Sequence, residues 1–197
     1  MIKIQHRINT SSELQTIDTR YGIEIDLRSY GKDVIVTHDV FREAETLDTW
    51  IKNFQHALLI LNVKEEGIEE KILEIVRRAG VEEYFFLDQS FPFLMRTLRT
   101  GNSRSALRFS DFESVETALL ITPRPNWIWV DSFSGDWEHL AVSAERLHSL
   151  GYKICVAAPE LHGRDDEREV EQLVKTLRSQ KDCIDAICTK VPDQWDD

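Results

Sequence analysis

Cysteine is scarce in this sequence, and its spacing limits what it can do. Three cysteines occur among 197 residues, at Cys155, Cys183 and Cys188. An odd number cannot pair completely, and the last two do not form a Cys-x-x-Cys motif, so neither a disulfide framework nor a zinc knuckle is indicated. We therefore expect the thiols to act as small buried hydrophobic groups.

Positive charge and long apolar runs are also in short supply. Lys and Arg total 24 against 35 Asp and Glu, which gives a net charge of -11. An acidic mean field repels phosphate backbones, so we expect no nucleic-acid partner. No apolar run approaches the roughly 20 residues that span a bilayer, so we expect no stable membrane insertion. The N-terminal residues lack the regions of a signal peptide, which favours a cytoplasmic location.

The sequence is rich in short, apolar, β-prone runs that alternate with segments of helical periodicity. Alternation of this kind favours parallel strands joined by helical crossovers. Among the segments that look helical, one covers residues 47–55, and another opens at Thr10, where a hydroxyl residue can cap the helix and Glu13 can support its first turn. The predicted strands cover residues 2–5, 23–27, 57–63, 84–87, 106–109, 127–130, 152–157 and 186–188, with a hairpin return strand over 34–37. We predict a compact α/β fold, a (β/α)8 TIM barrel over the single domain 1–197, with a short β-hairpin after the second strand.

An open doubly wound sheet is the alternative fold. It is disfavoured because no Gly-x-Gly-x-x-Gly motif or P-loop follows a predicted strand. The chain is shorter than the roughly 250 residues usual for the barrel, so we expect brief loops and one missing or reduced helix.

The second predicted strand carries two acidic residues, Glu24 and Asp26, within Ile-Glu-Ile-Asp-Leu. A period of two places them on one face and the apolar residues on the other. If the apolar face meets the helices, both carboxylates point into the barrel, where unpaired charge costs several kcal/mol. A bound divalent metal would offset that cost, and oxygen ligands suit Mg²⁺, Ca²⁺ or Mn²⁺. A solvated strand edge is the alternative.

Polar residues also stand at other predicted strand ends, where barrel enzymes place their active sites. His6 and Arg7 follow the first strand, and the hairpin delivers His38 to the level of the carboxylates. Asn62 and Lys64 share a face at the end of the third strand, and Lys64 suits a phosphate contact. Later strand ends carry residues that are weaker signals singly, namely Asp88, Arg108, Asp131 and the segment 160–162.

Taken in order, these motifs resemble the glycerophosphodiester phosphodiesterase branch of the phosphatidylinositol-phospholipase-C-like barrels. That family begins with His-Arg-Gly, continues with Glu-x-Asp, places His-Asp after a hairpin and ends its next strand with Glu-x-Lys. The corresponding residues are His6-Arg7, Glu24-x-Asp26, His38-Asp39 and Asn62-x-Lys64. The detailed match covers about the first third of the chain.

The resemblance implies a role for each matched residue. His6 and His38 correspond to the catalytic histidines, and Arg7 and Lys64 to the phosphate-binding positions. Glu24 and Asp26 correspond to the first two metal ligands, while the third metal carboxylate falls on Asn62. An amide in place of a carboxylate removes one negative charge, so the site should hold a divalent ion more weakly.

The expected function is metal-assisted hydrolysis of a small or lipid-derived phosphodiester, with His6 and His38 as general acid and base. The departures at Asn62 and at Ile8, which replaces the glycine of His-Arg-Gly, leave a second hypothesis open. In that hypothesis the barrel has lost turnover and serves as a ligand-binding or regulatory protein. An unrelated barrel enzyme, such as a phosphosugar isomerase, is a third.

Overall fold

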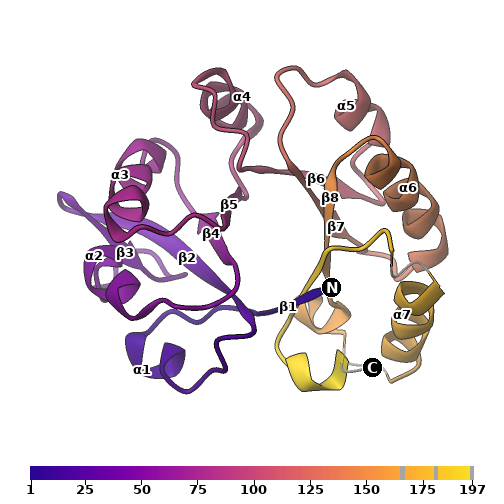
Figure 1. Cartoon of the computed structure of the whole chain (residues 1–197), viewed down its shortest axis with the longest axis horizontal. Helices are drawn as coiled ribbons and strands as arrows, with labels where there is room; N and C mark the ends of the chain where they lie inside the picture. The colour runs from indigo at the N-terminus through magenta and orange to yellow at the C-terminus, as the bar shows by residue number, and fades with distance from the viewer. Residues whose placement is uncertain (165–166, 180–181, 196–197) are drawn as a thin grey trace.

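The computed structural model describes residues 1–164, 167–179 and 182–195, and its centre is a sheet of parallel strands curved into a barrel (Figure 1). The strands lie in the order β5-β4-β2-β1-β9-β8-β7-β6. They are β1 (Ile2–Gln5), β2 (Gly22–Tyr30), β4 (Leu59–Val63), β5 (Tyr84–Leu87), β6 (Ala106–Ser110), β7 (Trp127–Asp131), β8 (Lys153–Ala157) and β9 (Ala186–Thr189). The predicted (β/α)8 architecture is confirmed.

The barrel is nearly closed rather than fully hydrogen-bonded. The outermost strands of the order, β5 and β6, meet through one isolated parallel bridge between Phe86 and Ser105. The Phe86 amide donates to the Arg104 carbonyl at 3.0 Å. The junction of β5 and β6 is therefore the weakest part of the strand ring.

The predicted hairpin is present and is longer than the sequence indicated. Strand β2 continues to Tyr30 and returns through Gly31, at φ 61°, into the antiparallel strand β3 (Asp33–Val36). The Thr37 amide then donates to the Asp26 carbonyl at 2.9 Å. The end of the hairpin is thereby fixed at the level of the second carboxylate.

Helices cover the outside of the barrel, and the first two are single turns. Thr10 caps the first helix in a capping box with Glu13. The helices are α1 (Ser11–Leu14), α2 (Leu47–Trp50), α3 (Glu69–Ala79), α4 (Phe91–Arg99), α5 (Val115–Leu120), α6 (Trp137–Ser149) and α7 (Glu167–Ser179), with 3-10 turns η1 (Ile51–Asn53), η2 (Pro159–His162) and η3 (Pro192–Trp195). Reduced helices explain how so short a chain completes the fold. Within the described ranges, no helix has the length and apolar character needed to cross a bilayer.

One predicted helix was too long. The segment 47–55 forms α2 and then η1, and ends where Phe54 takes an extended conformation with φ -79° and ψ 121°. Trp50 and Ile51 are buried there, so the apolar spacing reflects packing against the barrel rather than a continuous helix.

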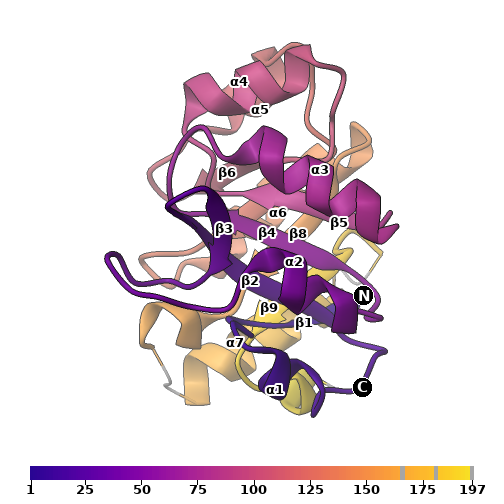
Figure 2. The ribbon, with the colours of Figure 1, turned by 90° about the vertical axis from the view of Figure 1, so that its left-hand side faces the viewer.

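The alternation of side chains along the strands separates two apolar regions. Outward residues of β2, such as Ile23 and Ile25, pack with Trp50 and Ile72 beneath α2 and α3, which cover this side of the sheet in Figure 2. Inward residues form the barrel interior, namely Ile4, Leu58, Ile60, Phe85, Leu87, Ala106, Trp127, Trp129, Cys155, Ala157, Ala186 and Cys188. Cys155 and Cys188 are buried as expected, and Cys183 is half-buried.

Candidate active site

The inward positions change from apolar to polar at the carboxyl ends of the strands. A cavity of about 130 Å³ lies there, which we call the mouth cavity. It is lined by His6, Arg7, Glu24, Asn62, Lys64, Leu87, Asp88, Arg108, Trp129, Asp131, Ala157, Leu161 and His162. Several strands thus contribute polar side chains to one place, as expected for the functional face of a parallel barrel.

Glu24 is fully buried and held in one position by three neighbours. The Arg7 amide donates to Oε2 at 2.7 Å, Nδ2 of Asn62 donates to Oε1 at 2.8 Å, and Nε2 of His6 lies 3.7 Å from Oε2. Burial, followed by repulsion from Asp26, raises the pKa of Glu24 to about 7, against the opposing effect of these hydrogen bonds. The carboxylate form of Glu24 therefore needs additional positive charge nearby.

Asp26 is also fully buried, and cationic side chains surround it. Nε of Arg7 lies 3.3 Å from Oδ2, and Nζ of Lys64 lies 3.3 Å from Oδ1. Asn9 donates to Oδ2 at 2.9 Å and accepts from the Asp26 amide at 3.0 Å. Both carboxylates therefore point into the barrel, as the alternation in the strand predicts, and Asn9 is a supporting residue that the sequence did not single out.

Two residues at the mouth have left-handed backbones although neither is a glycine. Arg7 has φ 58° and Asp88 has φ 61°. Such a conformation costs of order 1–3 kcal/mol and persists where surrounding contacts impose it. At Arg7 it places the amide on Glu24 while the guanidinium reaches Asp26.

His6 faces the mouth cavity with only 14% of its side chain exposed. Burial, together with the nearby charge of Arg7, lowers its pKa to about 4. The imidazole is therefore neutral near pH 7, which is the form that can accept a proton.

His38 stands apart from the mouth cavity, among whose described lining residues it is not found. Its side chain is 44% exposed, and Nδ1 lies 3.3 Å from Oδ1 of Asp39, which is itself 61% exposed. Its carbonyl accepts from Nε of Arg28 at 2.8 Å. The hairpin brings the His38 backbone near the site, while its imidazole pairs with a surface carboxylate.

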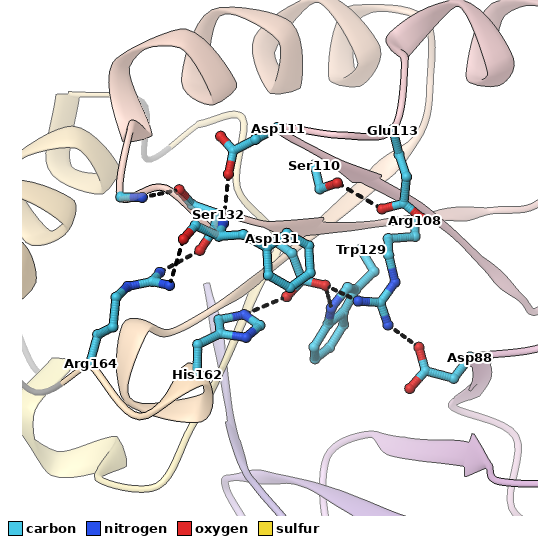
Figure 3. A network of polar contacts seen from close by, with 12 residues as sticks. Asp88, Arg108, Ser110, Asp111, Glu113, Trp129, Asp131, Ser132, His162 and Arg164 are labelled. Carbon is cyan, nitrogen blue, oxygen red and sulfur yellow. Dashed lines mark hydrogen bonds and ion pairs between the residues drawn. The ribbon is translucent and has the colours of Figure 1, made fainter.

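The other half of the mouth centres on Asp131, which Figure 3 shows with its partners. Asp131 is 1% exposed and accepts from Nε1 of Trp129 at 2.9 Å, from Arg108 and from Nε2 of His162 at 2.9 Å. Arg108 also pairs with Asp88. Because Nζ of Lys64 lies 3.4 Å from Oδ2 of Asp88, the contacts join both halves into one network.

From the sequence, the residues around Asp131 could be identified only as polar residues near the ends of strands. Asp131 and His162 are 31 residues apart, and Arg108 and Asp131 are 23 apart. Their position near the carboxyl end of a strand, or after it, was a usable signal. Their mutual contacts depend on the order of strands in the closed barrel and had no local signature.

Oxygen atoms suitable for a hard cation lie on Glu24, Asp26 and Asn62. Oδ1 of Asp26 and Oδ1 of Asn62 are buried and accept no hydrogen bond from the described residues, although Lys64 stands close to the former. Considering His, Cys, Asp and Glu alone, the described parts of the chain contain no group of three placed to hold a metal. Any ion here would have two carboxylates and one amide oxygen as ligands.

A second cavity of about 570 Å³ adjoins the mouth at the junction of β5 and β6. Asp88, Arg108 and Leu87 line both cavities. The second cavity also has apolar walls, including Leu94 and Phe112, and polar residues such as Glu113.

A parallel barrel with its polar network at the carboxyl ends of the strands has the architecture of the TIM-barrel enzymes. Among solved structures, the chain is similar to glycerophosphodiester phosphodiesterases. One from Thermotoga maritima has a TM-score of 0.71 and 18% identity, covering 99% of this chain and 96% of that chain. One from Agrobacterium tumefaciens has a TM-score of 0.69 and 16% identity, with 99% and 98% covered.

A third similar structure, a glycerophosphoryl diester phosphodiesterase from Parabacteroides distasonis, has a TM-score of 0.67 and 12% identity, covering 97% of this chain and 83% of that chain. The sequence matches no family model and no curated protein. At these identities the comparison establishes a shared fold over almost the whole chain. The fold implied by the resemblance in the first third of the sequence is therefore confirmed.

Proposed function

We propose that this protein is a metal-assisted phosphodiester hydrolase of the glycerophosphodiester phosphodiesterase type. The observation that carries the proposal is the convergence of His6, Glu24, Asn62, Lys64 and Arg7 on one cavity at the barrel mouth. An imidazole that can move a proton and cations that can bind a phosphate are the groups this reaction requires.

The donor atoms fit a hard divalent cation, because buried carboxylate and amide oxygens are left without hydrogen bonds and Glu24 is costly to ionise. Glu24, Asp26 and Asn62 would hold Mg²⁺, Ca²⁺ or Mn²⁺, which would offset the negative charge that grows on the phosphate oxygens. With one carboxylate fewer than the family pattern, we expect binding to be weak.

Arg7 and Lys64 are proposed to bind the phosphate. Both already lie at the mouth, against the same buried carboxylate, Asp26. A phosphate in the cavity would meet a guanidinium and an ammonium that are partly desolvated, where their attraction for an anion is stronger than in water. These two side chains would also hold the phosphorus in line with the attacking hydroxyl.

His6 is proposed to accept the proton of the attacking hydroxyl, which its neutral imidazole suits. His38 is the second histidine that the sequence predicts for the acid–base pair. To reach a phosphate its ring would turn away from Asp39, a rearrangement that exposed side chains make readily. The second cavity beside Arg108 would leave room for the alcohol of a small or lipid-derived phosphodiester.

The test is hydrolysis of a panel of glycerophosphodiesters and a chromogenic bis-aryl phosphate with Mg²⁺, Mn²⁺ or Ca²⁺. We expect turnover that chelation abolishes and that His6→Ala lowers by roughly 10²- to 10⁴-fold. His139→Ala is the matched control, because His139 is exposed on α6 outside the barrel. Metal-independent turnover that survives His6→Ala would reject the mechanism. Binding of a phosphodiester without turnover by any metal form would favour the ligand-binding alternative.

A further inference from the structure

The mouth cavity contains a second imidazole, and it belongs to His162 rather than His38. His162 ends η2, the 3-10 turn that begins at Pro159 directly after β8. Its side chain is 20% exposed, and His162 and His6 both line the mouth cavity. Two histidines from distant parts of the chain therefore border one small space.

The contacts of His162 hold its ring in a defined orientation. Nε2 lies 2.9 Å from Oδ1 of Asp131 (Figure 3). The ring also meets the Phe133 ring edge-on, with centroids 5.0 Å apart. Trp129 and Arg108 donate hydrogen bonds to the other carboxylate oxygen of Asp131, Oδ2. A carboxylate only accepts hydrogen bonds, so Nε2 carries the hydrogen and Nδ1 is the nitrogen left for exchange of a proton with a ligand.

This arrangement suits proton transfer. A buried carboxylate behind an imidazole fixes its tautomer and stabilises the imidazolium by direct attraction. His38 also pairs with a carboxylate, that of Asp39, but both side chains are exposed to solvent. An ion pair in solvent is weak, so Asp39 orients the His38 ring less firmly than Asp131 orients that of His162.

We propose that His162 is a catalytic residue of this hydrolase, the proton donor to the leaving alcohol, and that Asp131 is its positioning residue. The inference rests on the proposed function. In the reaction, the attacking oxygen bonds to phosphorus and its proton passes to a base. The bond from phosphorus to the alcohol oxygen breaks, and its electron pair stays on that oxygen. His162 enters this step as the imidazolium, with a hydrogen on each ring nitrogen, and its Nδ1 proton passes to the oxygen to complete the alcohol. His162 is left neutral, with Nε2 still donating to Asp131.

A proton donor to the leaving group has a distinctive kinetic signature. An alkoxide leaves poorly without a proton, whereas 4-nitrophenolate leaves readily without one. Loss of the donor should therefore slow hydrolysis of an alkyl ester far more than hydrolysis of an aryl ester. Loss of the base that activates the nucleophile should slow both.

The experiment compares glycerophosphodiesters that have an alkyl or a 4-nitrophenyl leaving group. We expect His162→Ala to lower kcat on the alkyl substrate by roughly 10²- to 10⁴-fold. On the aryl substrate we expect less than about a tenfold loss, because no proton transfer by His162 is needed there. Asp131→Asn should show the same selectivity to a smaller degree, with kcat falling more than KM changes. His6→Ala should impair both substrates.

Chemical rescue provides a second measurement. Imidazole added to His162→Ala should restore part of the alkyl-ester activity and leave the aryl-ester activity unchanged. His162→Gln serves if the alanine variant fails to fold, as judged by circular dichroism, and His139→Ala should match the parent protein on both substrates.

The outcomes separate the two proposals. If His38→Ala shows the leaving-group selectivity and His162→Ala does not, the inference is overturned and the proposed function stands. Equal losses on both substrates in His162→Ala also overturn it. If the unmodified protein hydrolyses neither substrate with any of the three metals, the proposed function fails and the inference fails with it.

Discussion

Replacing Glu24 by Gln should change how the stability of the barrel depends on pH. The folded-state pKa of Glu24 is raised to about 7 from 4.5, chiefly because the side chain is fully buried. Between these values the folded protein keeps a proton that the unfolded chain has lost. The stability that buried, protonated Glu24 contributes to the fold is therefore complete below pH 4.5 and is lost as the pH rises through 7. At roughly 1.4 kcal/mol per pH unit, this loss amounts to about 3 kcal/mol.

His6 acts in the opposite direction. Its folded-state pKa is lowered to about 4 from 6.5 by burial, so between these values the unfolded chain binds a proton that the folded protein does not. The stability contributed by His6 is present above pH 6.5 and is lost as the pH falls through 4, again by about 3 kcal/mol. In the unmodified protein the two effects nearly cancel between these pH limits.

Glu24→Gln removes the pH dependence that is due to Glu24, so the pH dependence that is due to His6 should become visible. We expect the free energy of unfolding of the variant to rise by about 3 kcal/mol from pH 4 to 6.5, where the parent protein changes little. Urea unfolding followed by circular dichroism, in the presence of a chelator, measures this directly. Glu138→Gln, at an exposed position in the first turn of α6, is the control. Parallel pH profiles for parent and Glu24→Gln would refute the argument.

Three further predictions concern single positions. Gly22→Ala should destabilise the fold by about 1–3 kcal/mol in urea unfolding, because the new Cβ would lie 2.8 Å from Cγ1 of Ile4; an unchanged midpoint would contradict the close packing. Phe41→Gly should raise stability by up to about 1 kcal/mol, since Phe41 is fully exposed at φ 55°, and a lower melting temperature would count against this. Lys64→Gln should lower kcat/KM for the proposed substrate by roughly 10- to 100-fold, with exposed Lys52→Gln as control, and equal kinetics would remove Lys64 from the phosphate site.

Several features of the fold followed from local sequence. The strand pattern of period two placed Glu24 and Asp26 inside the barrel, and their complete burial agrees with it. Thr10 and Glu13 form the capping box at the start of the first helix. The helix predicted over 47–55 was too long, because apolar side chains that pack on the barrel have the same spacing as those of an amphipathic helix.

The assembly of the site could be predicted only in part. His6, Arg7 and Lys64 line the mouth cavity with Glu24 and Asn62, while His38 pairs with Asp39 outside that lining. The sequence also contained no sign that Asn9 would brace Asp26 or that Asp131 would hold His162.

By itself the sequence determined the alternation of strands and helices, the hairpin after β2 and the inward direction of the two acidic side chains, because dihedral preferences and side-chain periodicity act over a few neighbouring residues. Tertiary structure alone decided which strand ends became neighbours, how far Glu24 and His6 were removed from water, and which histidines share the mouth cavity. Those properties depend on the curvature and closure of the whole barrel, which joins residues such as Asp131 and His162 that lie 31 positions apart.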